Sequence, residues 1–409
     1  MKRERIFAHR LAPLSGAMLF ALAGGAQAAA FVQCPGDENG DAVIDAPDTS
    51  ATIKCKHLSA GDGFITMADG KSQYIFGFFD VTGRPESTVM DVAKLRAEFS
   101  APNIVLDEGD EFYLTLSNVG MMMRPDLFDP HTVHFHGFPQ AASVFDGLPE
   151  SAIAINMGSS LTYYYNVAEP GTFMYHCHAE ATEHMQMGML GNLYVRPAQN
   201  KLPQGTVLGS HTHAPGDMYV YNDGDGSTRY DVEKAIQLGS IDSTFHDASL
   251  AVAPLPFAMM KSDYAVLNGR GYPDTVNPEP LSNDENGGFA SQNYDARVTA
   301  MQGQKVLLRL SNLSVTDFFT VSTTLGVPLK VIGQGARILR GGGVPEGEDL
   351  YFDTNSVTLG GGEARDVIID TAGVPPGTYF LYTTNLNYLS NGTEDFGGMM
   401  TEIVIQPNA

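Results

Sequence analysis

Histidine and cysteine side chains gather in two short stretches of the chain, where they could hold a metal ion. The first stretch contains His131, His134 and His136, and the second contains His176, Cys177, His178 and, slightly later, His184. Imidazole nitrogens and thiolate sulfur are ligands that copper and zinc favour in proteins. The two stretches therefore predict a metal centre.

Strand geometry divides these side chains between two faces. Within each stretch, histidines two residues apart share one face of a strand, and a residue at odd spacing points to the other face. The loop after the second stretch can fold back toward the odd-spaced side chains. We therefore expect one ligand group made of His131, Cys177, His184 and Met189. The opposite face would carry a second group, made of His134, His136, His176 and His178.

The first group has the composition of a blue-copper site. Two imidazoles, a thiolate and a weak methionine thioether suit copper in both of its oxidation states. A closed structural zinc site would not need the methionine. Ordinary core packing is the other alternative, but it does not explain why histidines gather around an unpaired thiol. We therefore expect copper as the cofactor.

An internal repeat predicts the elements that position these ligands. Pro-Gly-Thr-Phe at 170–173 recurs as Pro-Gly-Thr-Tyr at 376–379, and the strand-like run 192–195 recurs as 402–405. Each copy consists of short runs rich in Val, Ile, Thr, Tyr and Phe, broken by Gly, Pro, Asn and Asp. This pattern is typical of β-sandwiches. We expect an all-β protein of two tandem Greek-key β-sandwiches.

The chain divides into five expected segments. Residues 1–28 combine a basic start, an apolar run and a small-residue end, which indicates a secretory signal and export to a periplasm or the exterior. The apolar run is shorter than the roughly 20 residues that span a membrane, so no membrane span is expected. An N-terminal segment (29–59), a first unit (60–198), a linker (199–262) and a second unit (263–409) follow.

The ligand motifs resemble those of the multicopper oxidases, which are built from cupredoxin domains. His-Thr-Val-His-Phe-His-Gly at 131–137 and His-Cys-His at 176–178 carry the resemblance, and the repeat extends it over residues 60–409. It implies two cupredoxin-like sandwiches, similar to two-domain, laccase-like members, with a type 1 (blue) copper in the first. It implies that His134 serves a type 2 copper. It assigns the type 3 pair to His136, His176 and His178.

The same resemblance implies an activity. A small reductant or a metal ion would be oxidised at the blue copper, and electrons would pass along Cys177 to the copper cluster, where dioxygen is reduced. His184 would be the point of electron entry. The catalytic residues would then be Cys177, His184, His134 and His136.

The second unit departs from the family pattern. The repeat places Phe319, Ser322 and Thr324 opposite the histidines of the first stretch, and it places Tyr382, Thr383 and Thr384 opposite the second. The second unit has therefore lost its copper ligands, and the first unit alone has too few histidines for the family's cluster. We expect cluster ligands to be shared across subunits of a homotrimer. The remaining candidate ligands match no motif: His57, His211, His213 and His246.

Two other functions stay open. A cupredoxin electron carrier or copper-binding protein would need the blue site but not the four histidines. Copper nitrite reductases, also two-domain trimers, offer a second comparison. There His131 would be a blue-copper ligand, His136 and His176 would be type 2 ligands, and His134 would stand where that family has an acidic residue.

Charge and cysteine content limit the partners and the compartment. The formal net charge of −23 disfavours nucleic acid, which needs a basic surface. An exported chain with three cysteines should form one disulfide. Cys34 and Cys55 lie close together near the expected mature N-terminus and should form it, which leaves Cys177 free.

An acidic run in the N-terminal segment has the spacing of a calcium loop. Positions 1, 3, 5, 9 and 12 are occupied by Asp37, Asn39, Asp41, Asp45 and Asp48. Position 6, usually glycine, is Ala42. Calcium is one expectation for this loop, and a solvated acidic turn is the alternative.

Overall fold

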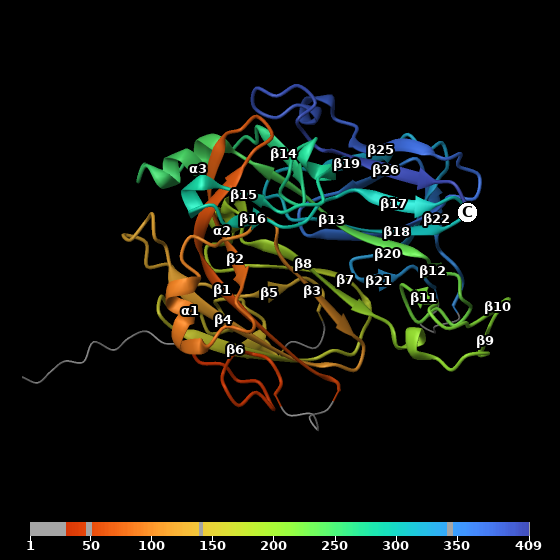
Figure 1. Ribbon diagram of the computed structural model, residues 1–409, viewed down its shortest axis with the longest axis horizontal. Helices are drawn as coiled ribbons and strands as arrows, with labels where there is room; N and C mark the ends of the chain where they lie inside the picture. Colours follow the sequence, from red (N-terminus) through yellow and green to blue (C-terminus); the bar gives the residue numbers. More distant parts are fainter. Residues whose placement is uncertain (1–29, 46–50, 139–141, 342–346, 409) are drawn as a thin grey trace, which may run out of the picture.

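The computed structural model describes residues 30–45, 51–138, 142–341 and 347–408. The expected signal segment and Asp48 lie outside the described residues. Within them, β-strands are the main secondary structure. The strands form two units that lie side by side, each with its own sheets (Figure 1). This confirms the prediction of an all-β chain.

The first unit has two four-stranded sheets in the described residues. One sheet has the order β2-β1-β4-β6, formed by Ser72–Asp80, Ile53–Thr66, Glu111–Gly120 and Ser160–Asn166. The other has the order β3-β8-β7-β5, formed by Ala101–Asp107, Leu190–Arg196, Gly171–His176 and His134–Phe135. Alternate side chains of both sheets fill the space between them, where Phe112, Tyr163 and Tyr175 are almost fully buried. The sheet that contains β5 and β7 carries the metal-ligand motifs.

The second unit repeats this plan with larger sheets. Its first sheet has the order β14-β13-β18-β24-β20-β21, with β22 also paired to β20: Tyr264–Leu267, Val232–Ile241, Lys305–Asn312, Glu363–Asp370, Leu329–Gln334, Arg337–Ile338 and Phe352–Thr354. Its second sheet has the order β17-β26-β25-β19-β23: Val298–Met301, Met400–Gln406, Gly377–Thr383, Phe319–Thr323 and Ser356–Leu359. Strand β13 comes from the segment expected to be a linker. It pairs in parallel with β18 because Ile236 and Leu238 bury their side chains in the second core.

Short elements complete the described chain. Three α-helices occur: α1 (Glu86–Val92), α2 (Ala181–Met187) and α3 (Ser243–Leu250). Small hairpins pair β9 (Val207–Leu208) with β10 (His211–Thr212), β11 (Met218–Tyr219) with β12 (Arg229–Tyr230), and β15 (Leu281–Ser282) with β16 (Ala290–Gln292). Single 3₁₀ turns lie at Ser143–Phe145, Ala198–Lys201, Phe257–Met259, Asp274–Val276, Asp284–Asn286 and Leu386–Leu389. Figure 1 shows hairpin β9–β10 projecting at the lower right, away from β5 and β7.

A buried polar network holds the two units together. Arg309 on β18 is fully buried, and its Nη1 donates to Thr172 Oγ1 on β7 at 3.0 Å. The Thr172 hydroxyl in turn donates to Asp366 Oδ1 on β24 at 2.5 Å. Because a buried charge is costly unless it is paired, this network specifies one arrangement of the units. It fixes β7, which carries a metal-ligand motif, against the second unit.

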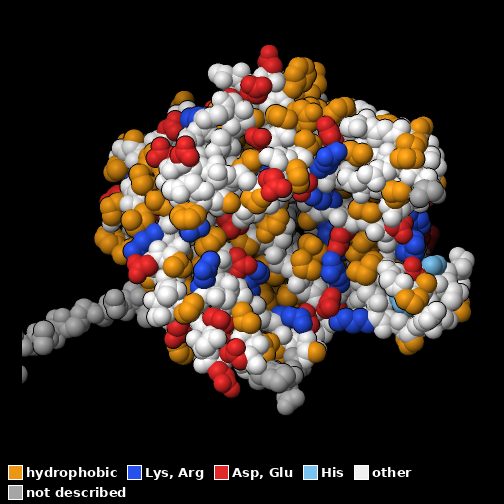
Figure 2. All heavy atoms as spheres, viewed as in Figure 1, with side chains coloured by type: hydrophobic (Ala, Val, Ile, Leu, Met, Phe, Trp, Pro, Cys, Tyr) orange, Lys and Arg blue, Asp and Glu red, His pale blue; other side chains and the backbone are white. Residues whose placement is uncertain are grey.

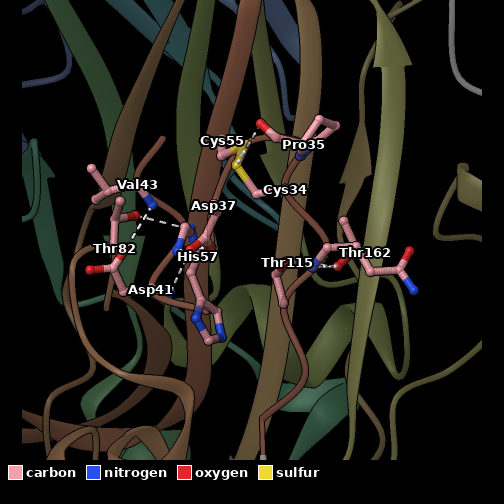
Figure 3. Close-up of a disulfide and its surroundings, with 12 residues drawn as sticks. Cys34, Pro35, Asp37, Asp41, Val43, Cys55, His57, Thr82, Thr115 and Thr162 are labelled. Atoms are coloured by element: carbon pink, nitrogen blue, oxygen red, sulfur yellow. Dashed lines mark hydrogen bonds between the residues drawn. A yellow bond between two sulfur atoms is a disulfide. The ribbon is translucent and has the colours of Figure 1, made fainter. Parts of the chain in front are cut away.

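The N-terminal segment is attached to the first unit by a disulfide between Cys34 and Cys55, as predicted (Figure 3). Beside it, the Asp37 carboxylate accepts hydrogen bonds from the backbone N–H groups of Asn39, Gly40, Asp41 and Ala42. Asp45 Oδ2 accepts from Glu38 N–H at 3.0 Å. The acidic loop is therefore a closed turn organised around its first aspartate.

The surface mixes both signs of charge. Lysine and arginine side chains lie among aspartate and glutamate across the face in Figure 2, and histidine surface shows at its right edge, beside the small hairpins. Across the described residues, none of the helices combines the length and the apolar character that crossing a membrane requires.

Candidate metal centre

Two neighbouring strands present the ligand motifs. Strands β5 and β7 pair antiparallel with His134 opposite His176 and Phe135 opposite Tyr175. The two aromatic rings pack together in the core at a centroid distance of 5.7 Å. Because side chains alternate along a strand, the two histidines point to the other face, toward the second unit.

One ligand group surrounds the free thiol. Cys177 Sγ lies 3.2 Å from His184 Nδ1 and 3.7 Å from His131 Nδ1, and all three residues are buried. With metal bonds of about 2.0–2.3 Å to nitrogen and thiolate, two ligands of one ion lie roughly 3.5 Å apart. The observed spacings fit one ion bound by these three atoms. The sulfur also accepts a hydrogen bond from Thr132 N–H at 3.4 Å.

The fourth expected ligand is adjacent to this group. Met189 is fully buried, its N–H donates to the carbonyl of His184 at 2.9 Å, and its carbonyl accepts from Cys177 N–H at 3.1 Å. The segment that carries His184 is helix α2 rather than the loop expected from the sequence. The helix ends at Met187, and the following Gly188, whose φ of 118° is left-handed, allows the turn back toward β8.

The two imidazoles of this group have different proton affinities. Burial lowers the pKa of His131 well below its usual range. Burial also opposes the charge of His184, but the Cys177 sulfur and Asp129 outweigh it and raise the pKa of His184 to about 10. A metal ion bound at Nδ1 would therefore have to displace a proton from the metal-free group.

The second ligand group lies on the opposite side of the Cys177 strand. Nε2 of His136 is 2.9 Å from Nε2 of His176, and the nearest ligand atoms of His134, His136 and His176 all lie within 4.8 Å of one another. The His178 ring lies 5.0 Å from the His134 ring. The structure thus brings together the four histidines that strand alternation predicted on one face.

Backbone carbonyls orient three of these rings in the same way. Nδ1 faces the carbonyl oxygen of Asp146 at 2.6 Å in His134, of Gly362 at 3.3 Å in His136, and of Cys177 at 2.8 Å in His176. A carbonyl only accepts, so each Nδ1 carries the proton and each neutral ring presents a lone pair at Nε2. Two facing lone pairs at 2.9 Å repel each other unless they share a proton or bind a metal ion, and imidazole nitrogens are a donor set that suits copper.

A pocket of about 590 Å³ is lined by His134 and His136 and is closed on one side by the second unit. The second unit contributes Gly335, Arg337 and Gly362 to it, rather than imidazoles. Burial lowers the pKa values of His134 and His136, and it lowers that of His176 to about 3. The rings are therefore neutral ligands at neutral pH.

The remaining candidate histidines have other partners. His57 Nε2 pairs with Ser117 Oγ at 2.7 Å, His211 Nε2 with Asp217 Oδ2 at 2.7 Å, and His213 Nδ1 with the Tyr219 hydroxyl at 3.1 Å. Both ring nitrogens of His246 face backbone carbonyls. Among the described residues, the structure does not bring these four histidines to the pocket.

The repeat is also visible in the strand pairing of the second unit. Strands β19 and β25 pair with Ser322 opposite Tyr382, in the register that β5 and β7 use for His134 and His176. The sequence comparison of the two copies therefore aligns spatially equivalent positions. The hydroxyl-bearing residues Ser322 and Tyr382 occupy the positions that His134 and His176 have in the first unit.

Sequence reasoning missed two acidic residues at the outer side of His184. Asp129 Oδ2 lies 3.8 Å from His184 Nε2. One oxygen of Asp129, one oxygen of Glu180 and one ring nitrogen of His184 all lie within 4.8 Å of one another. Glu180 is exposed, whereas the imidazole is fully buried. Asp129 precedes His131 by two residues, but nothing in the sequence links Glu180 to this position.

Part of the first unit matches a known protein family. Residues 81–200 match the family model described as multicopper oxidase. Laccase abr2 of Aspergillus fumigatus is 26% identical over 204 residues, which cover 49% of this chain and 32% of that protein. L-ascorbate oxidase of Cucurbita pepo var. melopepo is 32% identical over 116 residues, which cover 27% of this chain and 19% of that protein. The chain thus spans about a third or less of these curated relatives.

Solved structures resemble the whole fold. A blue copper oxidase from Nitrosomonas europaea superposes with a TM-score of 0.60 at 22% identity, covering 86% of both chains. A copper nitrite reductase from the same organism superposes with a TM-score of 0.55 at 16% identity, covering 87% of this chain and 94% of that one. The fold is therefore that of cupredoxin-type copper proteins, with two tandem sandwiches, as predicted.

Proposed function

We propose that this chain, whose residues 81–200 form a multicopper oxidase domain, is a copper-dependent oxidoreductase that oxidises a small reductant or metal ion and reduces dioxygen. His131, Cys177, His184 and Met189 would hold a type 1 copper. The histidine group would hold type 2 and type 3 copper, bound through His134, His136, His176 and His178. Copper at these two places would supply one-electron transfer between the reductant and dioxygen.

The main support for this proposal is that the two histidine groups turn different ring nitrogens toward the proposed metal positions. The two histidines beside Cys177 turn Nδ1 toward the sulfur, whereas three histidines on the other face donate Nδ1–H to carbonyls and present Nε2. Packing alone has no reason to produce two opposite orientations on the two sides of one strand. Two separate metal groups, each with its own ligand atoms, explain it.

The chain also provides a short connection between the groups. Cys177 is covalently bonded to His176, and the Cys177 carbonyl accepts from His176 Nδ1 at 2.8 Å. Sulfur and imidazole are therefore joined both through the backbone and through one hydrogen bond. This contact positions the His176 ring and supports the proposed electron path from the Cys177 side to the histidine pocket.

The acidic pair beside His184 supports entry of the reductant at this place. The imidazole is buried, but Asp129 beside its Nε2 is partly exposed and Glu180 is exposed, so carboxylates lie between this ring and solvent. Carboxylates favour a cationic reductant, such as a metal ion, or a reductant that must lose a proton. His184 would be the residue nearest to it.

A second candidate function follows from the pocket wall. Three histidines of one chain converge, and the second unit places glycine and Arg337 opposite them. Three such ligands are enough for a single copper, whereas a full cluster would need further ligands. This arrangement favours the nitrite-reductase-like alternative, in which one type 2 copper accompanies the blue copper. An electron carrier without oxidase activity would use the blue site alone.

The proposal also includes a homotrimer, export from the cell and calcium binding. A homotrimer would allow a neighbouring subunit to add ligands at the open side of the pocket, and sedimentation velocity would detect a monomer if this is wrong. Export to a periplasm or the exterior agrees with the Cys34–Cys55 disulfide. Calcium in the Asp37 loop would raise the melting temperature on addition of the ion.

The direct test compares two histidine variants of the copper-loaded protein. His136→Ala removes a proposed cluster ligand, and His211→Ala removes a partly exposed histidine of the β9–β10 hairpin. We expect oxidase turnover to fall by more than about 100-fold in the first variant, beyond the usual effect of an outer-shell partner. The second variant should keep wild-type turnover. Full dioxygen reduction by His136→Ala would refute the role of the cluster.

A further inference from the structure

His246 is a buried histidine that the proposed copper chemistry does not use. It lies on α3, between strands β13 and β14 of the second unit, and has no exposed surface. Nδ1 is 2.6 Å from the carbonyl oxygen of Tyr74, and Nε2 is 2.9 Å from that of Gln186. Carbonyl oxygens only accept hydrogen bonds, so donating to both requires the imidazolium form, with a proton on each nitrogen. Burial lowers the pKa of His246, and the two carbonyl partners act in the opposite direction and favour the protonated ring.

The Gln186 carbonyl belongs to the element that carries His184. Gln186 lies two residues after His184, in the last turn of α2, where helix carbonyls lack partners within the helix. Helix α2 has seven residues, and a helix so short has little stability of its own. An imidazole N–H at its C-terminal end supplies a missing partner and suits the helix dipole.

The Tyr74 carbonyl belongs to the strand that packs against the His184 ring. Tyr74 lies on β2, and Phe76 of the same strand meets the His184 ring edge-on at 5.9 Å. The Tyr74 hydroxyl donates to Asp62 at 2.9 Å, which fixes this end of β2. One imidazole thus bridges the two elements that determine where the His184 ring lies.

Helix α3 is itself firmly held, so it can act as a support. Asp242 caps its N-terminus by accepting from Phe245 N–H at 3.1 Å. The Arg124 guanidinium, from the first unit, donates to the carbonyl of Ser249 near its other end. Figure 1 shows α3 beside β1, β2 and α2, at the upper left of the molecule.

We propose that His246 is a positioning residue for the type 1 copper: by bridging the backbones of β2 and α2, it holds the His184 imidazole at the Cys177 sulfur. We call this bridge the His246 clamp. The proposal rests on the proposed function for its link to copper, but the mechanical link between α3 and α2 stands without the metal.

The first test needs no copper. Hydrogen exchange of the full metal-free chain would follow the backbone amides of residues 184–190 in wild type, His246→Gln and His246→Leu. His57→Gln is the matched control, because His57 is equally buried but bonds Ser117 on β4 and lies beside the disulfide (Figure 3). We expect these amides to exchange at least about tenfold faster in His246→Leu. We expect wild-type rates in His57→Gln.

Wild-type exchange at 184–190 in a folded His246→Leu variant would overturn the clamp. If that variant does not fold, His246→Gln decides, since its amide can replace one of the two donors and should give an intermediate rate. Wild-type exchange in a folded His246→Gln variant would then overturn it as well. In wild type, nitrogen-15 spectra should show a ring N–H protected from solvent, and rapid exchange of every ring proton would contradict the clamp.

The copper-loaded protein gives the second readout. Loss of the clamp should shift the type 1 electron-paramagnetic-resonance signature and the reduction potential, while copper bound by the four histidines stays unchanged. An unaltered type 1 signature in His246→Leu would overturn the positioning role. A wild-type protein without any type 1 signature would instead refute the proposed function, and the exchange experiment would still decide the clamp.

Discussion

At the scale of single residues, the candidate site is defined by which nitrogen of each ring faces the proposed metal position. His131 and His184 turn Nδ1 to Cys177, whereas His136 and His176 face each other through Nε2. The difference follows from the partner on the other nitrogen, since a carbonyl at Nδ1 leaves only Nε2 free as a ligand. Local hydrogen bonds therefore assign each histidine to its group.

The proton affinities predict different pH dependence for the two groups. The pKa of His184 is raised to about 10, so below that pH the metal-free site holds a proton that copper must displace. The proton on His184 alone should therefore make the apparent type 1 copper affinity rise at least about tenfold per pH unit between about pH 6 and pH 9. His176, with a pKa near 3, is already neutral there, so its group should change little.

Chelator competition across this range would check the prediction. The visible thiolate-to-copper absorption would report the first group, and bound copper in Cys177→Ser would report the second. A type 1 affinity that is constant with pH would contradict the assigned proton on His184.

At the scale of elements, one turn of the second unit shapes the histidine pocket. Gly362 has φ +86°, and a Cβ placed there would lie 2.9 Å from Cε1 of His136. Its carbonyl also accepts from His136 Nδ1. A side chain at this position would therefore strain the backbone and displace a proposed ligand.

Gly362→Ala should weaken copper binding by the histidine group and leave the type 1 signature unchanged. Gly303→Ala is the matched control, because Gly303 has φ +91° but a Cβ there meets only Asn408 Nδ2, at 3.9 Å. Both variants should lose about 1 kcal/mol or more of unfolding free energy from backbone strain. Equal copper retention in the two variants would show that the Gly362 turn does not position His136.

The Cys34–Cys55 disulfide stabilises the N-terminal segment against β1. It closes a loop with a sequence separation of 21, so replacing both cysteines by serine should cost about 3 kcal/mol of unfolding free energy. The copper groups are formed by other strands and should keep their spectra. Denaturant unfolding of the double variant beside wild type measures the loss, and an unchanged midpoint would contradict it.

At the scale of the whole molecule, the sequence predicted the fold through its repeat and the ligand groups through alternation. Strand parity placed His134 with His136 and Cys177 apart from its neighbours, because side-chain direction follows from position along a strand. The helix that carries His184, the Gly362 carbonyl and the acidic pair at Asp129 were not predictable. They depend on contacts between segments far apart in the chain.

The arrangement of the two units gives the histidine pocket its unusual character. The second unit keeps the sandwich and the strand register but presents Ser322 and Tyr382 where the first has imidazoles. It therefore contributes a wall and a backbone acceptor rather than ligands. A further histidine ligand for this pocket would have to come from outside the described residues, for example from a neighbouring subunit.

The measurement that tests the central claim most directly is copper per chain in the copper-loaded protein, by elemental analysis against quantified polypeptide. We expect at least two copper ions per chain, one of them lost in Cys177→Ser and the rest lost in a double variant of His136 and His176. A value near four would indicate a full cluster with shared ligands, and a value near two would indicate a single histidine-bound copper. A value of one, lost with Cys177, would contradict the claim that the four histidines form a second metal group.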